Sequence, residues 1–229
     1  MMALDWQRIE DDLNQGGCAV LPRLLDAGTC AALAAQYDDA SRFRSRVVMQ
    51  RHGFGRGEYQ YWAYPLPDAV AALRTGLYRP LAAIANRWHA TMGLEARFPP
   101  EHATFLARCH AAGQARPTPL LLRYGEGDYN CLHQDVYGEH VFPLQLAVLL
   151  SRPRDDFTGG EFVLTEQRPR MQSRAEVVPL AQGDAVLFPV AQRPVNGTRG
   201  SYRVNMRHGV SRLRSGVRHT LGIIFHDAS

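Results

Sequence analysis

The chain has 229 residues, enough for one domain with a sizeable core, and its 45% hydrophobic and 21% charged residues are typical of a globular protein. No apolar stretch approaches the length of a membrane span, and the N-terminus lacks the basic and apolar regions of a secretory signal, so we expect a cytoplasmic protein without membrane contact. The formal net charge is +4, and all 26 basic residues are Arg. Such a composition indicates either a GC-rich gene or a surface that faces a polyanion, since Arg binds phosphates bidentately and stacks on bases.

Segments with helical features dominate the first half of the chain. A short amphipathic helix is predicted from Asp5 to Gln15, and Asp26 is a candidate N-cap for a helix from Ala27 to about Ala40. Asp68 is a candidate N-cap for a long helix from Ala69 to Met92, and a further helix is expected after Pro99-Pro100 through His110.

The segment from Arg51 to Trp62 is basic, Gly-rich and aromatic. One interpretation is a mobile lid that stacks a base and contacts phosphates, with Arg56, Tyr59 and Tyr61 as candidate substrate contacts. The other is a glycine-rich hairpin whose aromatic side chains pack onto the core.

The second half changes to short β-type runs between Gly, Pro and Asp residues, a pattern typical of a closed sandwich or jelly roll. The predicted strands are Leu120–Tyr124, Leu144–Leu150, Glu161–Leu164, Glu176–Leu180, Ala185–Phe188, Tyr202–Met206 and Thr220–Phe225. We therefore expect an α+β fold in a single domain, with 1–115 as a mainly helical support and 116–229 as the β core.

His133-Gln134-Asp135 is the most informative motif. In an extended strand, residues i and i+2 point to the same side, so an imidazole and a carboxylate would be offered together. They are two of the three ligands of the 2-His-1-carboxylate triad, which holds non-haem Fe(II). His208, on a later predicted strand, is the candidate third ligand.

Ten residues after His208 stands Arg218, with Thr220 at the start of the last predicted strand. A co-substrate that chelates iron through its α-keto acid leaves a distal carboxylate to be held in a partly buried site. A bidentate guanidinium with a neighbouring hydroxyl is suited to that carboxylate.

The sequence from Leu120 to Phe225 resembles the 2-oxoglutarate/Fe(II)-dependent oxygenases. Within that superfamily, the stretch from Tyr124 through Gly127 to Leu132-His133-Gln134-Asp135 looks like the AlkB-type nucleic-acid demethylases, in which the Tyr contacts 2-oxoglutarate. The whole chain also resembles a bacterial family of oxygenases presumed to act on alkylated DNA. The resemblance implies a double-stranded β-helix (jelly-roll, cupin-like) core.

Three positions depart from the AlkB pattern. Leu122 stands where that group has an Asn that contacts the co-substrate, and Tyr137 stands where it has a base-contacting Asp. Arg203-Val204-Asn205 precedes His208, so Arg218 instead follows the arrangement of prolyl-hydroxylase-like members. These departures leave the iron chemistry intact but weaken the case for a nucleic-acid substrate. Tyr137 is retained as a candidate substrate contact.

The resemblance implies an enzyme with Fe(II), 2-oxoglutarate and O2 as cofactors. His133, Asp135 and His208 would hold the metal, and Arg218, Tyr124 and Thr220 would fix the far carboxylate. The substrate would be hydroxylated while 2-oxoglutarate is converted to succinate, and a hydroxylated N-methyl group would leave as formaldehyde. The expected partner is nucleic acid carrying alkylated bases.

Other functions stay open at this point. A hydroxylase of an amino acid, peptide or small metabolite keeps the same chemistry. A zinc hydrolase could use two His and one Asp but would not explain Arg218. A cupin-like binding or sensing module would carry the same residues without turnover.

Overall fold

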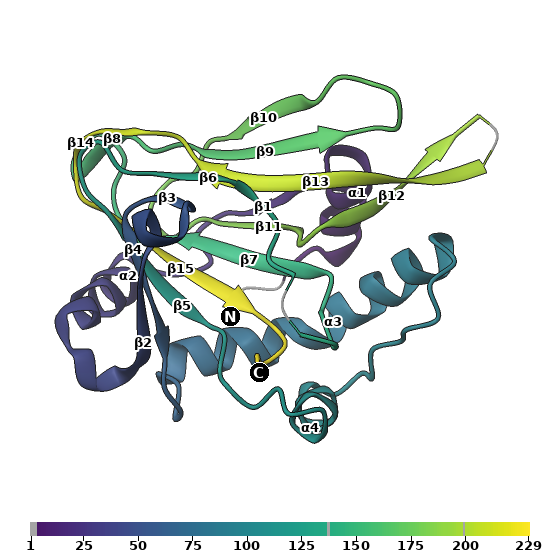
Figure 1. Ribbon diagram of the computed structural model, residues 1–229, viewed down its shortest axis with the longest axis horizontal. Coiled ribbons are helices and arrows are strands. Elements are labelled where there is room, and N and C mark those ends of the chain that lie inside the picture. Colours follow the sequence, from purple (N-terminus) through teal and green to yellow (C-terminus); the bar gives the residue numbers. More distant parts are fainter. Residues whose placement is uncertain (1–3, 137, 199) are drawn as a thin grey trace.

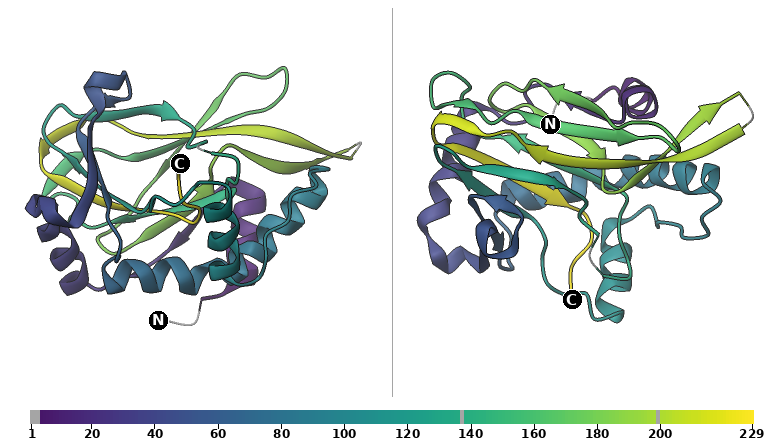
Figure 2. Two further views of the ribbon diagram at one scale, coloured as in Figure 1. Left: turned by 60° about the horizontal axis from the view of Figure 1, so that its bottom comes forward. Right: turned by 45° about the horizontal axis from the view of Figure 1, so that its top comes forward.

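The structure is a computed structural model, and it describes residues 4–136, 138–198 and 200–229. Two antiparallel β-sheets face each other, and helices cover the outer side of the larger sheet (Figure 1 and Figure 2). Within the residues described, no helix is both long and apolar enough to cross a membrane.

The helices largely follow the sequence signals. They are α1 (Trp6–Gly16), α2 (Ala27–Ala34), α3 (Asp68–Thr91) and α4 (His102–Ala111), with the short 3-10 turns η1 (Ala35–Asp38), η2 (Ala40–Arg42) and η3 (Met49–His52). The Asp26 side chain accepts from the Thr29 amide and caps α2 as expected, but α2 ends at Ala34 and continues only as a 3-10 turn. Asp68 is the first residue of α3 and not its cap.

The larger sheet has the order β1 (Ala19–Leu21), β11 (Ala185–Pro189), β7 (Leu144–Leu149), β15 (Arg218–Ile224), β5 (Leu120–Tyr124), β4 (Glu58–Trp62) and β2 (Phe43–Val48). The smaller sheet has the order β10 (Arg174–Val178), β9 (Phe162–Gln167), β13 (Gly200–Val210), β6 (Tyr129–His133) and β3 (Gly55–Arg56), and β12 (Gln192–Gly197) also pairs with β13. A separate pair joins β14 (Leu213–Gly216) to β8 (Phe157–Gly159).

Along β15, successive side chains point to opposite faces of the larger sheet. Leu221 and Ile223 belong to the main core, which packs against the helices. Arg218, Thr220 and Ile224 point to the opposite side, into the space between the sheets. The period of two in a strand therefore separates the stabilising face of this sheet from the face that lines the functional site.

Two expectations for the first half of the chain need correction. Residues 1–115 are not only a helical support, because β1, β2 and β4 are part of the larger sheet. For the segment 51–62, the structure favours an ordered arrangement over a lid in its second part. Its residues 58–62 form β4, which pairs with β2 on one side and β5 on the other, so its backbone is held by two neighbours.

Candidate active site

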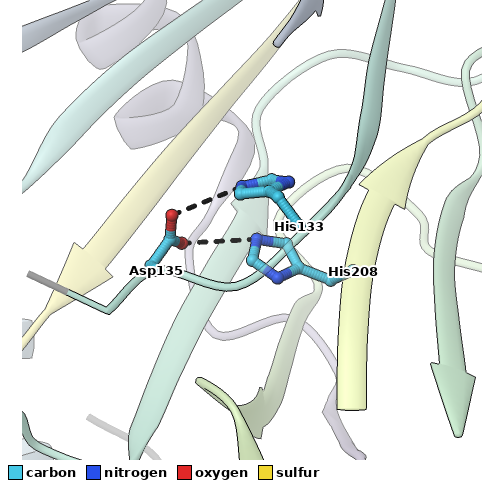
Figure 3. A group of neighbouring side chains, drawn as sticks. All are labelled: His133, Asp135 and His208. Carbon is cyan, nitrogen blue, oxygen red and sulfur yellow. Dashed lines mark ion pairs between the residues drawn. The ribbon is translucent and has the colours of Figure 1, made fainter. Parts of the chain in front are cut away.

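Three side chains with metal-binding atoms converge between the sheets. His133 ends β6, Asp135 follows two residues later, and His208 lies on β13 (Figure 3). Asp135 Oδ1 is 3.3 Å from His133 Nε2, and Asp135 Oδ2 is 3.4 Å from His208 Nε2. One ligand atom from each residue lies within 4.8 Å of the others. Atoms at this spacing fit a common ion at the ligand distances of about 2.0–2.2 Å that His and carboxylate groups adopt.

A β-bulge turns His133 toward His208. His133 of β6 pairs with His208 of β13, and Asn130 of β6 pairs with Val210 of β13. Only Gly209 lies between the two paired positions on β13, whereas two residues lie between them on β6, so β6 carries the bulge. Both Asn130 and His133 consequently face the space between the sheets. A Cβ atom on Gly209 would lie 2.7 Å from the backbone oxygen of Asn130, so this close approach of the strands requires glycine.

Burial and mutual hydrogen bonds set the protonation states in this His–Asp–His group, and they favour the metal-binding form of Asp135 and His208. His133 Nδ1 lies 2.8 Å from the Cys131 carbonyl oxygen, which orients Nε2 toward Asp135. Burial opposes ionisation of Asp135, yet hydrogen bonds from both histidines hold its pKa well below the usual range. Burial also lowers the pKa of His208, which keeps that ring neutral. Burial acts in the same direction on His133, but Asp135 outweighs it and raises the pKa of that ring.

A second polar group lies deeper between the sheets. Arg218 is paired with Tyr124 across β15 and β5, is only 2% exposed, and donates to the Thr220 hydroxyl. Its guanidinium forms no ion pair with any residue that the structure describes, and burial lowers its pKa to about 10. Among the residues that the structure describes, the Tyr124 hydroxyl and Arg218 Nε are buried without a hydrogen-bond partner. We call Arg218, Thr220 and Tyr124 the Arg218 group. Buried donors of this kind suit an anionic ligand.

One cavity of about 250 Å³ contains both groups. Apart from these residues, its wall is mostly apolar, with Leu120, Leu122, Ala147, Phe162, Phe188 and Val210 among the lining side chains. An apolar cavity with a few convergent polar groups is the usual form of a small-molecule or cofactor site.

The remaining candidate residues have different positions. Tyr59 and Tyr61 of β4 line the cavity with ring centroids 5.4 Å apart, and the Arg44 guanidinium lies 4.5 Å above the Tyr61 ring. Arg56 does not line the cavity; its side chain is 54% exposed, with Nε 3.8 Å from Asp128 Oδ1. Tyr137 lies outside the described residues.

Three carboxamides also line the cavity. Gln134 belongs to the predicted motif and donates to the carbonyl oxygens of Ala191 and Met206, whereas sequence reasoning missed Asn130 and Gln145. Asn130 enters through the bulge of β6, for which the sequence carries no clear signal. Gln145 could have been identified from the sequence, because it is a single polar residue within the apolar run from Leu144 to Leu150.

Comparison with solved structures confirms the predicted fold. An oxidoreductase of the 2OG-Fe(II) oxygenase family from Burkholderia pseudomallei is 16% identical with a TM-score of 0.56, covering 100% of this chain and 96% of that one. A prolyl-4-hydroxylase from Pseudomonas putida is 16% identical with a TM-score of 0.54, covering 98% and 99%. The expected cofactors Fe(II), 2-oxoglutarate and O2 agree with this fold and with the His–Asp–His group.

Sequence comparison leads to the family. An uncharacterized protein of Mycobacterium tuberculosis, found in two strains, is 50% identical over 165 residues, which are 72% of this chain and 71% of the relative. A family model described as "Oxygenase, catalysing oxidative methylation of damaged DNA" matches residues 57–228, which include β4 and every residue of the His–Asp–His group. The predicted enzyme class is therefore confirmed, and the chain belongs to the Oxygenase-NA family of oxygenases.

Proposed function

We propose that this oxygenase removes N-methyl groups from alkylated DNA by oxidation, with Fe(II) bound by His133, Asp135 and His208. The observation that carries the proposal is the joint presence of the His–Asp–His group and the Arg218 group in one cavity. A zinc hydrolase would need the first group but would have no use for a buried arginine that has no acidic partner among the described residues.

The Arg218 group binds the distal carboxylate of 2-oxoglutarate in this proposal. The guanidinium provides the charge, and the hydroxyls of Thr220 and Tyr124 provide further polar contacts. An anion would thus compensate a charge that is otherwise buried alone.

When bound, Fe(II) with 2-oxoglutarate and O2 supplies oxidative power sufficient to hydroxylate a C–H bond. Bound together, they would deliver one oxygen atom to the substrate methyl group and the other to succinate, with loss of CO2 from 2-oxoglutarate. The N-hydroxymethyl product then breaks its C–N bond, the hydroxyl proton transfers to nitrogen, and formaldehyde leaves. The apolar cavity wall excludes water from this chemistry.

DNA as the substrate is supported by the family and by the aromatic wall of the cavity. The family description names damaged DNA. Tyr59 and Tyr61 line the cavity with rings at 88° to each other, so one ring can stack on a planar base while the other contacts its edge. Arg44 adds positive charge over the Tyr61 ring. Arg56, exposed on β3, is suited to a phosphate contact and not to the base. Tyr137 keeps its assignment as a candidate substrate contact.

A second candidate is hydroxylation of a peptide, amino acid or small metabolite. It is favoured by Arg218, which stands ten residues after His208 as in prolyl-hydroxylase-like oxygenases, and by Leu122 in place of the AlkB-type Asn. Both candidates use the same metal and co-substrate groups, so the substrate alone distinguishes them.

The test is product analysis on matched substrates. The purified protein, supplied with Fe(II), 2-oxoglutarate and O2, is incubated with N-methylated single-stranded and duplex oligonucleotides, proline-containing peptides and free amino acids. The proposal expects formaldehyde and succinate in equal amounts from a methylated oligonucleotide, and neither product above background from the His208→Ala variant. Hydroxylation of a peptide or amino acid without formaldehyde release from any oligonucleotide would favour the second candidate.

A further inference from the structure

Gln145 is the one polar residue on β7, a central strand of the larger sheet. All six residues of this strand are buried, and the other five are Leu144, Leu146, Ala147, Val148 and Leu149. Gln145 is 3% exposed and pairs with Phe188 on one side and Ile224 on the other. Because a carboxamide costs free energy when it is buried without hydrogen bonds, a purely structural role would require good partners.

Protein partners for the Gln145 carboxamide are nearly absent. Its Nε2 lies 3.5 Å from His208 Nε2, at the outer limit of a hydrogen bond, and no other hydrogen bond of this side chain is present in the described residues. The side chain lines the cavity beside the His–Asp–His group. The carboxamide thus offers a donor and an acceptor to a ligand.

The sheet register places Gln145 far from the Arg218 group. On β15, Thr220 pairs with Leu149 of β7 and Ile224 pairs with Gln145. Four residues of strand correspond to about 13 Å between these rows. The distal carboxylate of the co-substrate is accounted for at one end of the cavity, and Gln145 stands at the other end, where the reacting group of the substrate must come.

We propose that Gln145 is a specificity-determining residue that hydrogen-bonds the edge of the methylated base next to the carbon that is oxidised. This inference rests on the proposed function. The amide pairs naturally with a base edge that presents a donor next to an acceptor, and such bidentate pairs discriminate by about 5- to 150-fold in affinity. The Tyr59 and Tyr61 rings are nearly perpendicular, at 88°, so one of them can stack on the base and set its plane while the carboxamide sets its rotation.

The test measures binding without turnover. Protein loaded with Mn(II) and 2-oxoglutarate is titrated with a fluorescent N-methylated oligonucleotide, for the wild type, Gln145→Leu and Gln145→Glu. Separate titrations give the affinities for Mn(II) alone and for 2-oxoglutarate. The matched control is Gln60→Leu, because Gln60 is also buried but bonds the Tyr37 carbonyl oxygen on the helical side of the sheet.

We expect Gln145→Leu to weaken oligonucleotide binding by roughly 5- to 150-fold while affinities for Mn(II) and 2-oxoglutarate stay within about twofold. With Fe(II), the same variant should release more succinate than formaldehyde, because a misplaced methyl group is oxidised less often. Gln60→Leu should lower thermal stability and leave all three affinities unchanged.

Other outcomes overturn the inference in distinguishable ways. Weaker Mn(II) binding in Gln145→Leu would mean that the carboxamide orients His208, and weaker 2-oxoglutarate binding would assign it to the co-substrate. If Gln145→Leu binds the oligonucleotide as tightly as the wild type and unfolds at the same temperature, Gln145 does not contact the substrate. If Gln145→Leu does not fold, Gln145→Glu decides by the same three affinities. A wild-type protein that binds and demethylates no oligonucleotide would refute the proposed function itself.

Discussion

Arg218→Met should affect co-substrate binding and protein stability in opposite directions. Arg218 is 2% exposed and has no acidic partner in the described part of the chain. Its pKa of about 10, against an ordinary value of 12.5, corresponds to roughly 3 kcal/mol of unfavourable free energy for the charged form. Methionine fills similar space without charge, at the loss of a hydrogen bond to Thr220 worth about 1 kcal/mol. We therefore expect the variant without co-substrate to be about 1–3 kcal/mol more stable.

Co-substrate binding should respond in the other direction. Without the guanidinium, the distal carboxylate of 2-oxoglutarate would be buried with no opposite charge, at a cost of about 2–5 kcal/mol. This corresponds to a dissociation constant roughly 30- to 5,000-fold higher. Mn(II) affinity should not change, since Arg218 lies away from the His–Asp–His group, at the position of β15 that pairs with Tyr124 of β5.

The assay is chemical denaturation of the Mn(II)-loaded wild type and variant, with and without saturating 2-oxoglutarate. Ligand that binds only the folded state stabilises by about 4.1 kcal/mol at about 1,000 times its dissociation constant, which exceeds the roughly 1–3 kcal/mol expected from the substitution. The order of stabilities should therefore reverse, with Arg218→Met higher without co-substrate and the wild type higher with it. A variant that is less stable without co-substrate and binds it normally would refute the reasoning and make Arg218 a structural residue. Arg218→Lys is the control that keeps the charge but loses the planar fork.

Three further predictions address the strand register, pH and the aromatic wall. Gly209→Ala should weaken Mn(II) binding at least tenfold, because the added Cβ would lie 2.7 Å from the Asn130 backbone oxygen and shift the bulge of β6. A titration that gives the wild-type Mn(II) affinity would contradict this prediction. Burial lowers the pKa of His102 and His226 to about 4, so the unfolded state binds more protons below the ordinary value of 6.5. Denaturation curves should accordingly show stability falling by roughly 1.4 kcal/mol per pH unit for each histidine between about pH 6.5 and 4, and a flat profile would count against it. Tyr61→Leu should weaken binding of a methylated oligonucleotide by about 1–3 kcal/mol without changing 2-oxoglutarate affinity, and equal losses for both ligands would exclude a stacking role.

The β core was largely predictable because its strands are apolar and bounded by turn residues. The predicted strand 120–124 agrees with β5, and 144–150 differs from β7 by one residue. The spacing of His133, Asp135, His208 and Arg218 also led to residues that share one cavity. His208 and Arg218 each lie on a predicted or nearly predicted strand, where the period of two sets which side chains face the cavity.

Other features depend on contacts that local patterns do not encode. The sequence of the segment 51–62 fits either a lid or a glycine-rich hairpin, and only the pairing with β2 and β5 shows that residues 58–62 form a strand of the larger sheet. Asp135 lies beyond the end of β6, so its approach to His133 comes from the turn of the chain and not from strand alternation. The role of Gly209 in the bulge appears only when β6 and β13 are side by side.

The most direct test of the central claim is the ratio of formaldehyde to succinate released from an N-methylated oligonucleotide. We predict a ratio near one for the wild type with Fe(II), 2-oxoglutarate and O2, and no product above background for His208→Ala. Succinate produced without formaldehyde, together with a hydroxylated peptide or amino acid, would contradict the assignment of DNA as the substrate. Equal turnover in the wild type and His208→Ala would contradict the assignment of the metal site.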